Sequence, residues 1–357
     1  MKRFIFRRYP QAKKMSKTYI IGDLHGCFDE FIELTNQIGI NDNDLVISLG
    51  DIVDRGNKSV ELYRYFKNRE NSIVLMGNHE RKHQRGILSY SQEIVKVQFG
   101  DEYNEFVKWT ESLEYFYETE DTIIVHAFFE HDKKLQDQKQ EVLSGTTSGS
   151  KYLENKYEEG KFWTDYYTGV KPVVYGHHVV GEEPKIYNNT YGIDTGACHG
   201  GKLTILELPS FKLHQIKVPK DYWKEEQSKW QIPVLKAKNW EEMKIEFIHN
   251  QISKLSYKEE VEIKEFLKEI ENWINNVQNS IIIIKKKLEQ ITIELKEKYQ
   301  EKFNKEVAKL SYRTFIFKAN SQNLQVSDLE KVLNTPQKVI DLALELNLSE
   351  IPNRKSQ

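Results

Sequence analysis

Glycine is missing from the whole second part of this chain. All 18 glycines lie between Gly22 and Gly201, and no proline occurs between Pro233 and Pro336. Glycine marks tight turns and close backbone approaches, whereas proline interrupts helices. The first part of the chain is therefore predicted to be rich in turns, and the second part to hold long helices.

Cysteine, long apolar runs and an excess of one charge are also lacking. The two cysteines, Cys27 and Cys198, form no CxxC pair and no disulfide pattern, which favours a reducing, cytoplasmic compartment. No apolar run reaches the roughly 20 residues of a membrane span, so we expect no membrane association. A net charge of -2 excludes a general affinity for polyanions. The 39% of hydrophobic residues is enough for a proper core.

The composition divides the chain into four predicted parts. The first seventeen residues hold seven basic side chains and no acidic one, without the apolar middle of a signal peptide. We expect a basic leader there, with Met15 as a natural alternative start and a basic binding arm as the other possibility. The parts are a leader over residues 1–17, an α/β domain over 18–220, a linker over 221–238 and a helical module over 239–357.

Short β-branched runs alternate with helical stretches in the α/β domain. Residues 28–39 and 58–69 have the pattern of amphipathic helices between early strands. Such alternation predicts βαβ units and a partly parallel sheet, and the later strands, which lack long helices between them, predict an antiparallel portion. The candidate strands are TYII, LVISL, SIVLM, TIIVH, VVYG, TYGID and KLTILEL.

The tail has helix-start signals and a heptad repeat. Capping-box patterns at Asn239 and Ser256 predict two helix starts, and Thr335 with Pro336 predicts the start of a last short helix. Apolar residues recur with steps of four and three from Ile263 to Leu295, as in a coiled coil. This seam needs a partner, which could be the preceding helix, the catalytic domain or a second chain.

Most of the predicted strands end on a residue that can bind a metal or transfer a proton. Open α/β sheets place their sites at the carboxyl ends of strands, so these residues are expected to meet. They are Asp23 with His25, Asp51 with Asp54 and Arg55, Asn78 with His79, and then His126, His177 and Asp194.

The chemistry of this set predicts a pair of metal ions. Oxygen and imidazole donors without thiolates suit Mn²⁺, Fe, Zn²⁺ or Mg²⁺, and there are too many of them for one tetrahedral ion. Two ions sharing a carboxylate would hold a phosphoryl group and activate a water. Arg55 can grip phosphate oxygens, and His79 can protonate the leaving oxygen while Asp54 orients its imidazole.

The motifs GDLHG, GDIVDRG, GNHE, HA and GH, in this order between Gly22 and His177, resemble the phosphoprotein phosphatase branch of the calcineurin-like metallophosphoesterases. The resemblance covers about residues 18–218 and implies a four-layer αββα sandwich with two divalent ions, most often Mn²⁺. It implies the following ligands: Asp23, His25 and Asp51 for the first ion, and Asp51, Asn78, His126 and His177 for the second. It also implies that Arg55 and Asn78 contact the substrate and that His79 and Asp54 form the acid pair.

Two positions depart from the family pattern. Many members carry a second phosphate-binding arginine between the last two histidines, but no arginine occurs here from Gly86 to Tyr312. Lys161 could supply the missing charge. Phe128 stands where family members have glycine, and this ring is expected to crowd the substrate pocket.

These features leave three hypotheses for function. The first is a serine/threonine protein phosphatase acting on phosphoproteins. The second is an RNA-end or nucleotide phosphoesterase, since residues 173–209 resemble both the phosphatase module of bacterial polynucleotide kinase-phosphatase and the diadenosine tetraphosphatases. The latter usually lack the aspartate found here as Asp54. The third, a scaffold with a dead site, conflicts with the intact ligand set. The tail could recruit a partner protein or self-associate.

Overall fold

The computed structural model describes residues 17–258 and 260–348. The predicted leader lies, except for Lys17, outside the described residues. By its internal packing the chain divides into two compact units, Met1–Val234 and Leu235–Gln357. Within the described residues, no helix is long and apolar enough to cross a membrane.

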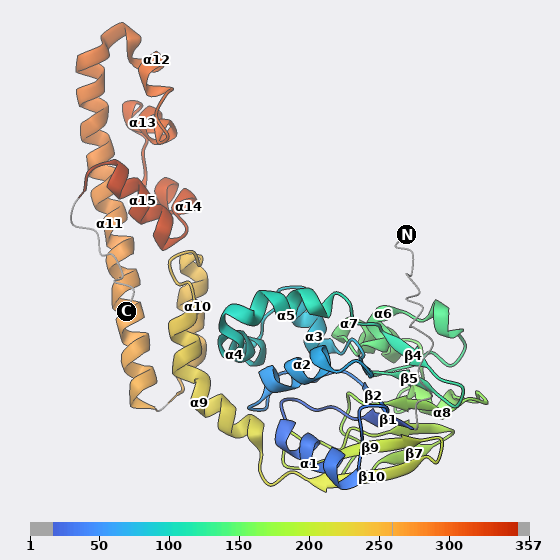
Figure 1. Ribbon diagram of the computed structural model, residues 1–357. Coiled ribbons are helices and arrows are strands. Elements are labelled where there is room, and N and C mark those ends of the chain that lie inside the picture. The colour runs from blue at the N-terminus through green and yellow to red at the C-terminus, as the bar shows by residue number, and fades with distance from the viewer. Residues whose placement is uncertain (1–16, 259, 349–357) are drawn as a thin grey trace. The chain divides into compact units, whose positions relative to one another are not determined.

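The first unit contains two five-stranded mixed sheets (Figure 1). In the first sheet, of order β10-β9-β1-β2-β3, β1, β2 and β3 are parallel, while β9 and β10 add an antiparallel edge. In the second, of order β4-β5-β6-β8-β7, β5, β6 and β8 are parallel. The strands are β1 (Thr18–Ile21), β2 (Leu45–Ser48), β3 (Ser72–Val74), β4 (Phe116–Glu118), β5 (Ile123–Val125), β6 (Val173–Tyr175), β7 (Lys185–Tyr187), β8 (Thr190–Gly192), β9 (Lys202–Leu208) and β10 (Lys212–Lys217).

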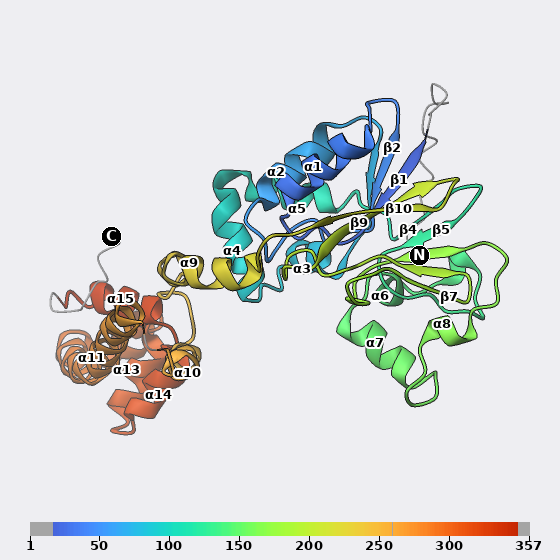
Figure 2. The ribbon, with the colours of Figure 1, turned by 90° about the horizontal axis from the view of Figure 1, so that it is seen from below.

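Helices cover the outer face of each sheet, which gives four layers (Figure 2). Successive side chains of a strand point to opposite faces. Tyr19 and Ile21 accordingly pack under the helices of the first sheet, while Ile20 packs between the sheets. The αββα sandwich is confirmed. The helices of this unit are α1 (Phe28–Ile38), α2 (Ser59–Asn68), α3 (Asn78–Gln84), α4 (Tyr90–Phe99), α5 (Tyr103–Thr110), α6 (Gln140–Leu143), α7 (Thr147–Glu154) and α8 (Trp163–Tyr166), with short 3₁₀ segments η1 (Gly100–Glu102) and η2 (Leu135–Asp137).

Residues 221–238, expected as a linker, contain the helix α9 (Tyr222–Ala237). Its first residue belongs to the core of the first unit, because Tyr222 is buried against α1 and its hydroxyl donates to Glu30 Oε1 at 2.7 Å. Farther along α9, the carbonyl of Gln227 accepts from the Tyr90 hydroxyl at 2.7 Å. Most of α9 therefore belongs with the first unit.

The second unit is all helical and centres on the 39-residue helix α11 (Val261–Tyr299) (Figure 1). The predicted seam is buried from Ile263 to Leu288, where it packs on α10 and on the helices that follow α11. Beyond Leu288, Thr292 is buried while Ile291 is only half-buried. The other elements are α10 (Ile245–Leu255), η3 (Gln300–Lys302), α12 (Phe303–Val307), α13 (Arg313–Asn320), α14 (Val326–Val332) and α15 (Pro336–Glu345).

Two of the three predicted helix starts in the tail are wrong. Asn239 precedes a turn, and α10 begins only at Ile245. Ser256 follows the last residue of α10, and α11 begins at Val261. Glu259, the last residue of the second pattern, lies outside the described residues. The third start is confirmed, since Thr335 caps α15 by accepting from the Lys338 N–H.

Candidate metal centre

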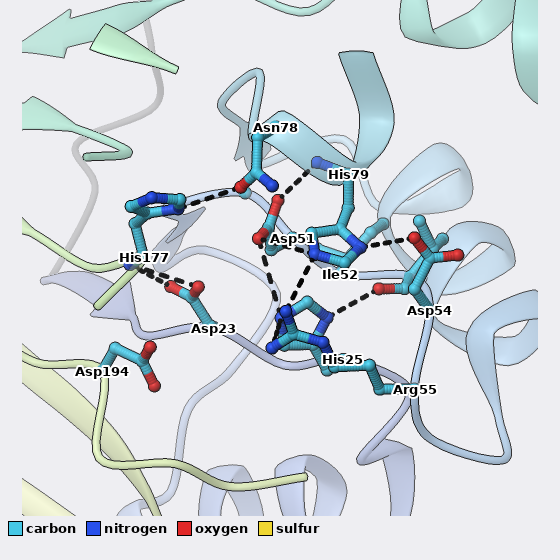
Figure 3. Close-up of polar contacts among 12 residues, drawn as sticks. Asp23, His25, Asp51, Ile52, Asp54, Arg55, Asn78, His79, His177 and Asp194 are labelled. Carbon is cyan, nitrogen blue, oxygen red and sulfur yellow. Dashed lines mark hydrogen bonds and ion pairs between the residues drawn. The ribbon is translucent and has the colours of Figure 1, made fainter. Parts of the chain in front are cut away.

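The site lies where the parallel strands of both sheets end. Asp23 and His25 follow β1, Asp51 follows β2, and Asn78 opens α3 after β3. From the second sheet, His126 follows β5, His177 follows β6 and Asp194 follows β8. Figure 3 shows side chains from both sheets converging on one centre.

Asp51 stands at the middle of this arrangement. Its Oδ2 atom lies 3.6 Å from His25 Nε2 and 3.6 Å from His126 Nε2. Two groups of candidate ligand atoms, each within 4.8 Å of one another, share this carboxylate: one holds His25 and His79, the other His126 and His177. One shared carboxylate between two groups is the arrangement that a pair of ions requires.

Second-sphere hydrogen bonds fix the histidine rings. His25 Nδ1 donates to the carbonyl of Val53 at 2.8 Å, and His126 Nδ1 donates to that of Leu49 at 3.0 Å. Each bond leaves Nε2 facing the site as the ligand atom. Burial lowers the pKa of both rings, and of His177, so the neutral imidazoles that metals bind are favoured.

Asn78 lies between two of the histidines. Its Oδ1 is 2.9 Å from His177 Nδ1 and 3.2 Å from His126 Nε2. The carboxylate of Asp23 accepts from the backbone N–H of His177 at 3.1 Å. Asp23 belongs to neither group of candidate ligand atoms found among the described residues, although it lies beside the others in Figure 3.

Three buried carboxylates lie close together in the site, those of Asp23, Asp51 and Asp194. Burial raises the pKa of Asp23 well above its usual range, and the charges of Asp194 and Asp51 raise it further. Burial also raises the pKa of Asp194, to about 6. Burial acts to raise the pKa of Asp51, but His126, His79 and His25 outweigh it and hold this carboxyl well below its usual value. Closely spaced acids with neutral imidazoles fit divalent cations, which would compensate their charge.

The backbone at the site is strained. Five non-glycine residues adopt a left-handed φ: His25 (41°), Asp51 (49°), Asp54 (72°), Arg55 (65°) and His177 (71°). Each such residue costs about 1–3 kcal/mol, and such residues cluster where a ligand geometry must be imposed. The motif glycines permit this packing. A Cβ on Gly77 would lie 2.1 Å from Asp51 Oδ1, and one on Gly176 would lie 2.2 Å from Asp23 Oδ1.

The two residues predicted as the acid pair are in contact. His79 Nδ1 lies 2.5 Å from Asp54 Oδ2, and Asp54 is fully buried. Burial acts to raise the pKa of Asp54, but His83 and His79 outweigh it, so this carboxyl stays ionised. His83 Nε2 donates to the other carboxylate oxygen at 3.0 Å, and Gln92 donates to Asp54 Oδ2.

Arg55 contacts the two histidines of the first group of candidate ligand atoms. Its guanidinium donates from Nη1 to His25 Nε2 at 3.2 Å and from Nη2 to His79 Nε2 at 3.1 Å. The group therefore lies between a candidate metal ligand and the candidate acid.

Sequence reasoning missed three residues that hold this site together, Glu80, His83 and Gln92. Asp194 was expected to meet the others at the strand ends but was given no role as a ligand. Glu80, inside the GNHE motif, is buried and accepts from the backbone N–H groups of Asp51 and Ile52. His83 lies four residues after His79 on α3, a spacing that could have revealed it. Gln92 on α4 has no signal in the sequence.

The sequence profile of the family described as "Calcineurin-like phosphoesterase" matches residues 16–195. This match covers half of the chain, and it includes every predicted site residue. The chain belongs to this family. Calcineurin-like phosphoesterases hydrolyse phosphoric esters at a centre of two divalent metal ions.

Several curated relatives of this chain in the family have one name. A bis(5'-nucleosyl)-tetraphosphatase PrpE (asymmetrical) of Bacillus cereus is 33% identical over an alignment of 237 positions, which covers 56% of this chain and 93% of the relative. The protein of the same name from Anoxybacillus flavithermus is 31% identical over 231 residues, with the same coverage. Among solved structures, a putative diadenosine tetraphosphatase superposes with a TM-score of 0.48 at 18% identity over 58% of this chain and 95% of that one.

Proposed function

We propose that this chain hydrolyses dinucleoside tetraphosphates. The support is the likeness of residues in the first unit to proteins named bis(5'-nucleosyl)-tetraphosphatase, over 93% of their length. Of the hypotheses from the sequence, the nucleotide phosphoesterase has better support than the protein phosphatase. The resemblance to polynucleotide kinase-phosphatase stays a prediction.

The predicted ligands would make up a set for two ions. Asp23, His25 and Asp51 would hold one ion; Asp51, Asn78, His126 and His177 would hold the other. When bound, such ions supply Lewis acidity toward a phosphoryl oxygen and lower the pKa of the attacking water. Manganese is the ion that we propose first, since hard oxygen donors and imidazoles suit it.

Arg55 would orient the phosphate that is attacked. Its guanidinium presents two N–H groups in a plane, which match two oxygens of one phosphate. Because its Nη atoms lie within 3.2 Å of His25 and His79, whose ring centroids are 4.7 Å apart, a phosphate would lie beside this pair of rings and next to the guanidinium.

His79 would give a proton to the leaving oxygen. Its Nδ1 is tied to Asp54, so the proton would be given from Nε2, once the Arg55 group that donates to this atom has turned to the phosphate. Asp54 orients the ring and stabilises its charged form. In asymmetrical cleavage, water attacks a terminal phosphorus of the bridge, one P–O bond breaks, and a nucleoside monophosphate and a nucleoside triphosphate leave.

The same acid pair favours a second candidate, a serine/threonine protein phosphatase. A serine or threonine alkoxide is a poor leaving group that requires a proton, whereas a nucleotide phosphate leaves readily without one. Asp54, which diadenosine tetraphosphatases usually lack, is fully buried and bonded to His79, His83 and Gln92. This arrangement is one that a phosphoprotein substrate would use.

A substrate panel with Mn²⁺ decides between the candidates. It contains diadenosine tetraphosphate, phosphoserine peptides, and RNA with 3′- or cyclic phosphates. We expect kcat/KM to be at least about tenfold higher for the tetraphosphate, with AMP and ATP as products. A preference for the phosphopeptides would reverse the order of the two candidates, and a preference for RNA ends would reject both.

A further inference from the structure

A cavity of about 370 Å³ adjoins the candidate metal centre on the second sheet's helical side. This is within the range of small-molecule sites, roughly 300–1,000 Å³. The lining includes the aromatic residues Phe128, Tyr157, Phe162 and Trp163, and His178. Every lining residue belongs to the segments around α7 and α8 or directly follows β5 or β6, so the cavity lies wholly within the first unit.

The cavity shares a wall with the metal centre. The ring centroid of Phe128 lies 5.4 Å from that of His177, a candidate ligand, and the two rings are nearly perpendicular at 86°. His178, the next residue, lines the cavity and has its centroid 4.5 Å from that of His177. A group in the cavity would therefore be a near neighbour of a phosphate at the metals. Phe128, expected to crowd the pocket, is a buried wall of this second compartment.

The aromatic walls are held in place. Phe162 and Phe128 pack edge to face at 5.7 Å, and Phe162 lies 6.1 Å from His178. The backbone N–H of Phe162 donates to Asp165 at 2.7 Å, which fixes it at the start of α8. Tyr157 stacks on Tyr166 at 4.9 Å. Such a site is pre-organised for a flat ring, because little side-chain freedom remains to be lost on binding.

The charges around the cavity disfavour a phosphate inside it. Glu154, Glu158 and Glu159 line the cavity, against the single ammonium of Lys161. Carboxylates accept hydrogen bonds from the exocyclic amines of bases and from hydroxyls, and they repel phosphate. The favoured occupant is thus a planar, uncharged group with hydrogen-bond donors, attached to a phosphate that lies outside.

We propose that this cavity binds a nucleobase of the substrate, with Phe162 as the stacking residue. The inference rests on the proposed function and deepens it, since it assigns recognition of the nucleoside to residues 128–178. Stacking on an aromatic ring tolerates any base, so purines of both kinds would be accepted.

The first test measures binding without turnover. Labelled adenosine is dialysed to equilibrium against the full-length protein, against Phe162→Ala and against Phe162→Tyr. We expect saturable binding that weakens about tenfold or more in Phe162→Ala and is restored in Phe162→Tyr. Phe28→Ala is the control. It removes a half-buried ring of the same unit that does not line the cavity, and it should bind adenosine as the unchanged protein does. Absence of saturable binding, or an equal loss in Phe28→Ala, would overturn the inference.

The second test separates the nucleobase from the phosphates. Diadenosine tetraphosphate and inorganic tetraphosphate are each used to inhibit hydrolysis of an aryl phosphate by the Mn²⁺-loaded protein. The inhibition constant of diadenosine tetraphosphate, divided by that of inorganic tetraphosphate, should rise about tenfold in Phe162→Ala, because only diadenosine tetraphosphate carries a base. A constant ratio would reject the nucleobase site while leaving the proposed function intact. Conversely, inhibition by diadenosine tetraphosphate that depends on Phe162, without its hydrolysis, would reject the proposed function alone.

Discussion

Glu80 holds the backbone of Asp51. Glu80 Oε2 accepts from the Asp51 N–H at 2.8 Å, and Oε1 accepts from the Ile52 N–H at 2.9 Å. Burial and the charge of Asp51 raise the pKa of Glu80 to about 8, while the backbone N–H groups of Asp51 and of Glu80 itself favour its ionised form. Because Asp51 has a left-handed φ, these bonds stabilise a conformation that the chain alone would not keep.

Replacing this carboxylate should loosen the metal centre. Glu80→Gln keeps the shape but places an NH₂ group against one of the two N–H donors. We expect metal affinity to fall about 10–100-fold, the usual effect of losing an outer-sphere partner, as measured by equilibrium dialysis with Mn²⁺. Glu33→Gln, on the exposed face of α1, is the matched control. Unchanged affinity in Glu80→Gln would show that the centre does not depend on this support.

His79→Asn should slow turnover without loss of metal. We expect kcat for phenyl phosphate to fall about 10²–10⁴-fold, the usual contribution of a positioned general acid. The loss should be much smaller for nitrophenyl phosphate, whose leaving group needs no proton. Metal content is measured on the same samples. Equal losses on the two substrates would remove His79 from the role of acid.

Gly77→Ala should abolish metal binding, although the φ of Gly77 is −81° and suits alanine. The added Cβ would lie 2.1 Å from Asp51 Oδ1 and 2.7 Å from Glu80 Oε2, so the shared carboxylate would have to move. Gly39→Ala is the control, because its Cβ meets nothing within 4 Å and only its left-handed φ of 80° is strained. Equal activity and metal content in both variants would refute this steric reading.

The helical tail should be dispensable for the chemistry. Ile274 and Ile281 are buried in the seam of α11, and burial of each contributes roughly 1.5–3 kcal/mol. Ile274→Lys with Ile281→Lys should therefore reduce helix content by circular dichroism while hydrolysis of an aryl phosphate persists. Ile282→Lys with Ile293→Lys is the matched control, since these side chains on the same helix are 47% and 60% exposed.

A truncated chain tests the same separation of units. It should end near Val234 rather than near Lys220, because a shorter chain would lose Tyr222 from the core and expose Glu30. The truncated protein is expected to fold and to hydrolyse an aryl phosphate with Mn²⁺. If it is soluble and loaded with metal yet inactive, the tail takes part in the active site.

The sequence was most informative where local chemistry determines structure. Every candidate strand is present, because short β-branched runs between turns rarely form any other secondary structure. The strand-end residues converge because parallel strands must end at a common edge. The edge strands β4, β7 and β10 were missed, since Lys185–Tyr187 and Lys212–Lys217 are too polar and too exposed to show a buried pattern.

The supporting contacts of the site could not be read from the sequence. Asp54 and Gln92 are 38 positions apart, and only the packing of α4 brings them together. The sequence patterns placed the starts of α10 and α11 several residues too early, because capping residues also occur in ordinary turns. Tertiary packing determines where each of these helices begins. The sequence also left the packing partner of the seam undecided. The helices α13 and α15 pack on α11 only after the chain has reversed direction, so no local pattern identifies them.

Metal dependence of hydrolysis tests the dinuclear centre most directly. The full-length protein is stripped with chelator, dialysed, and assayed on diadenosine tetraphosphate and an aryl phosphate while Mn²⁺ is added back. We predict no turnover above background in the stripped protein, full recovery as two ions bind per chain, and no recovery in Asp51→Asn. Full activity of the stripped protein in excess chelator would contradict the dinuclear mechanism.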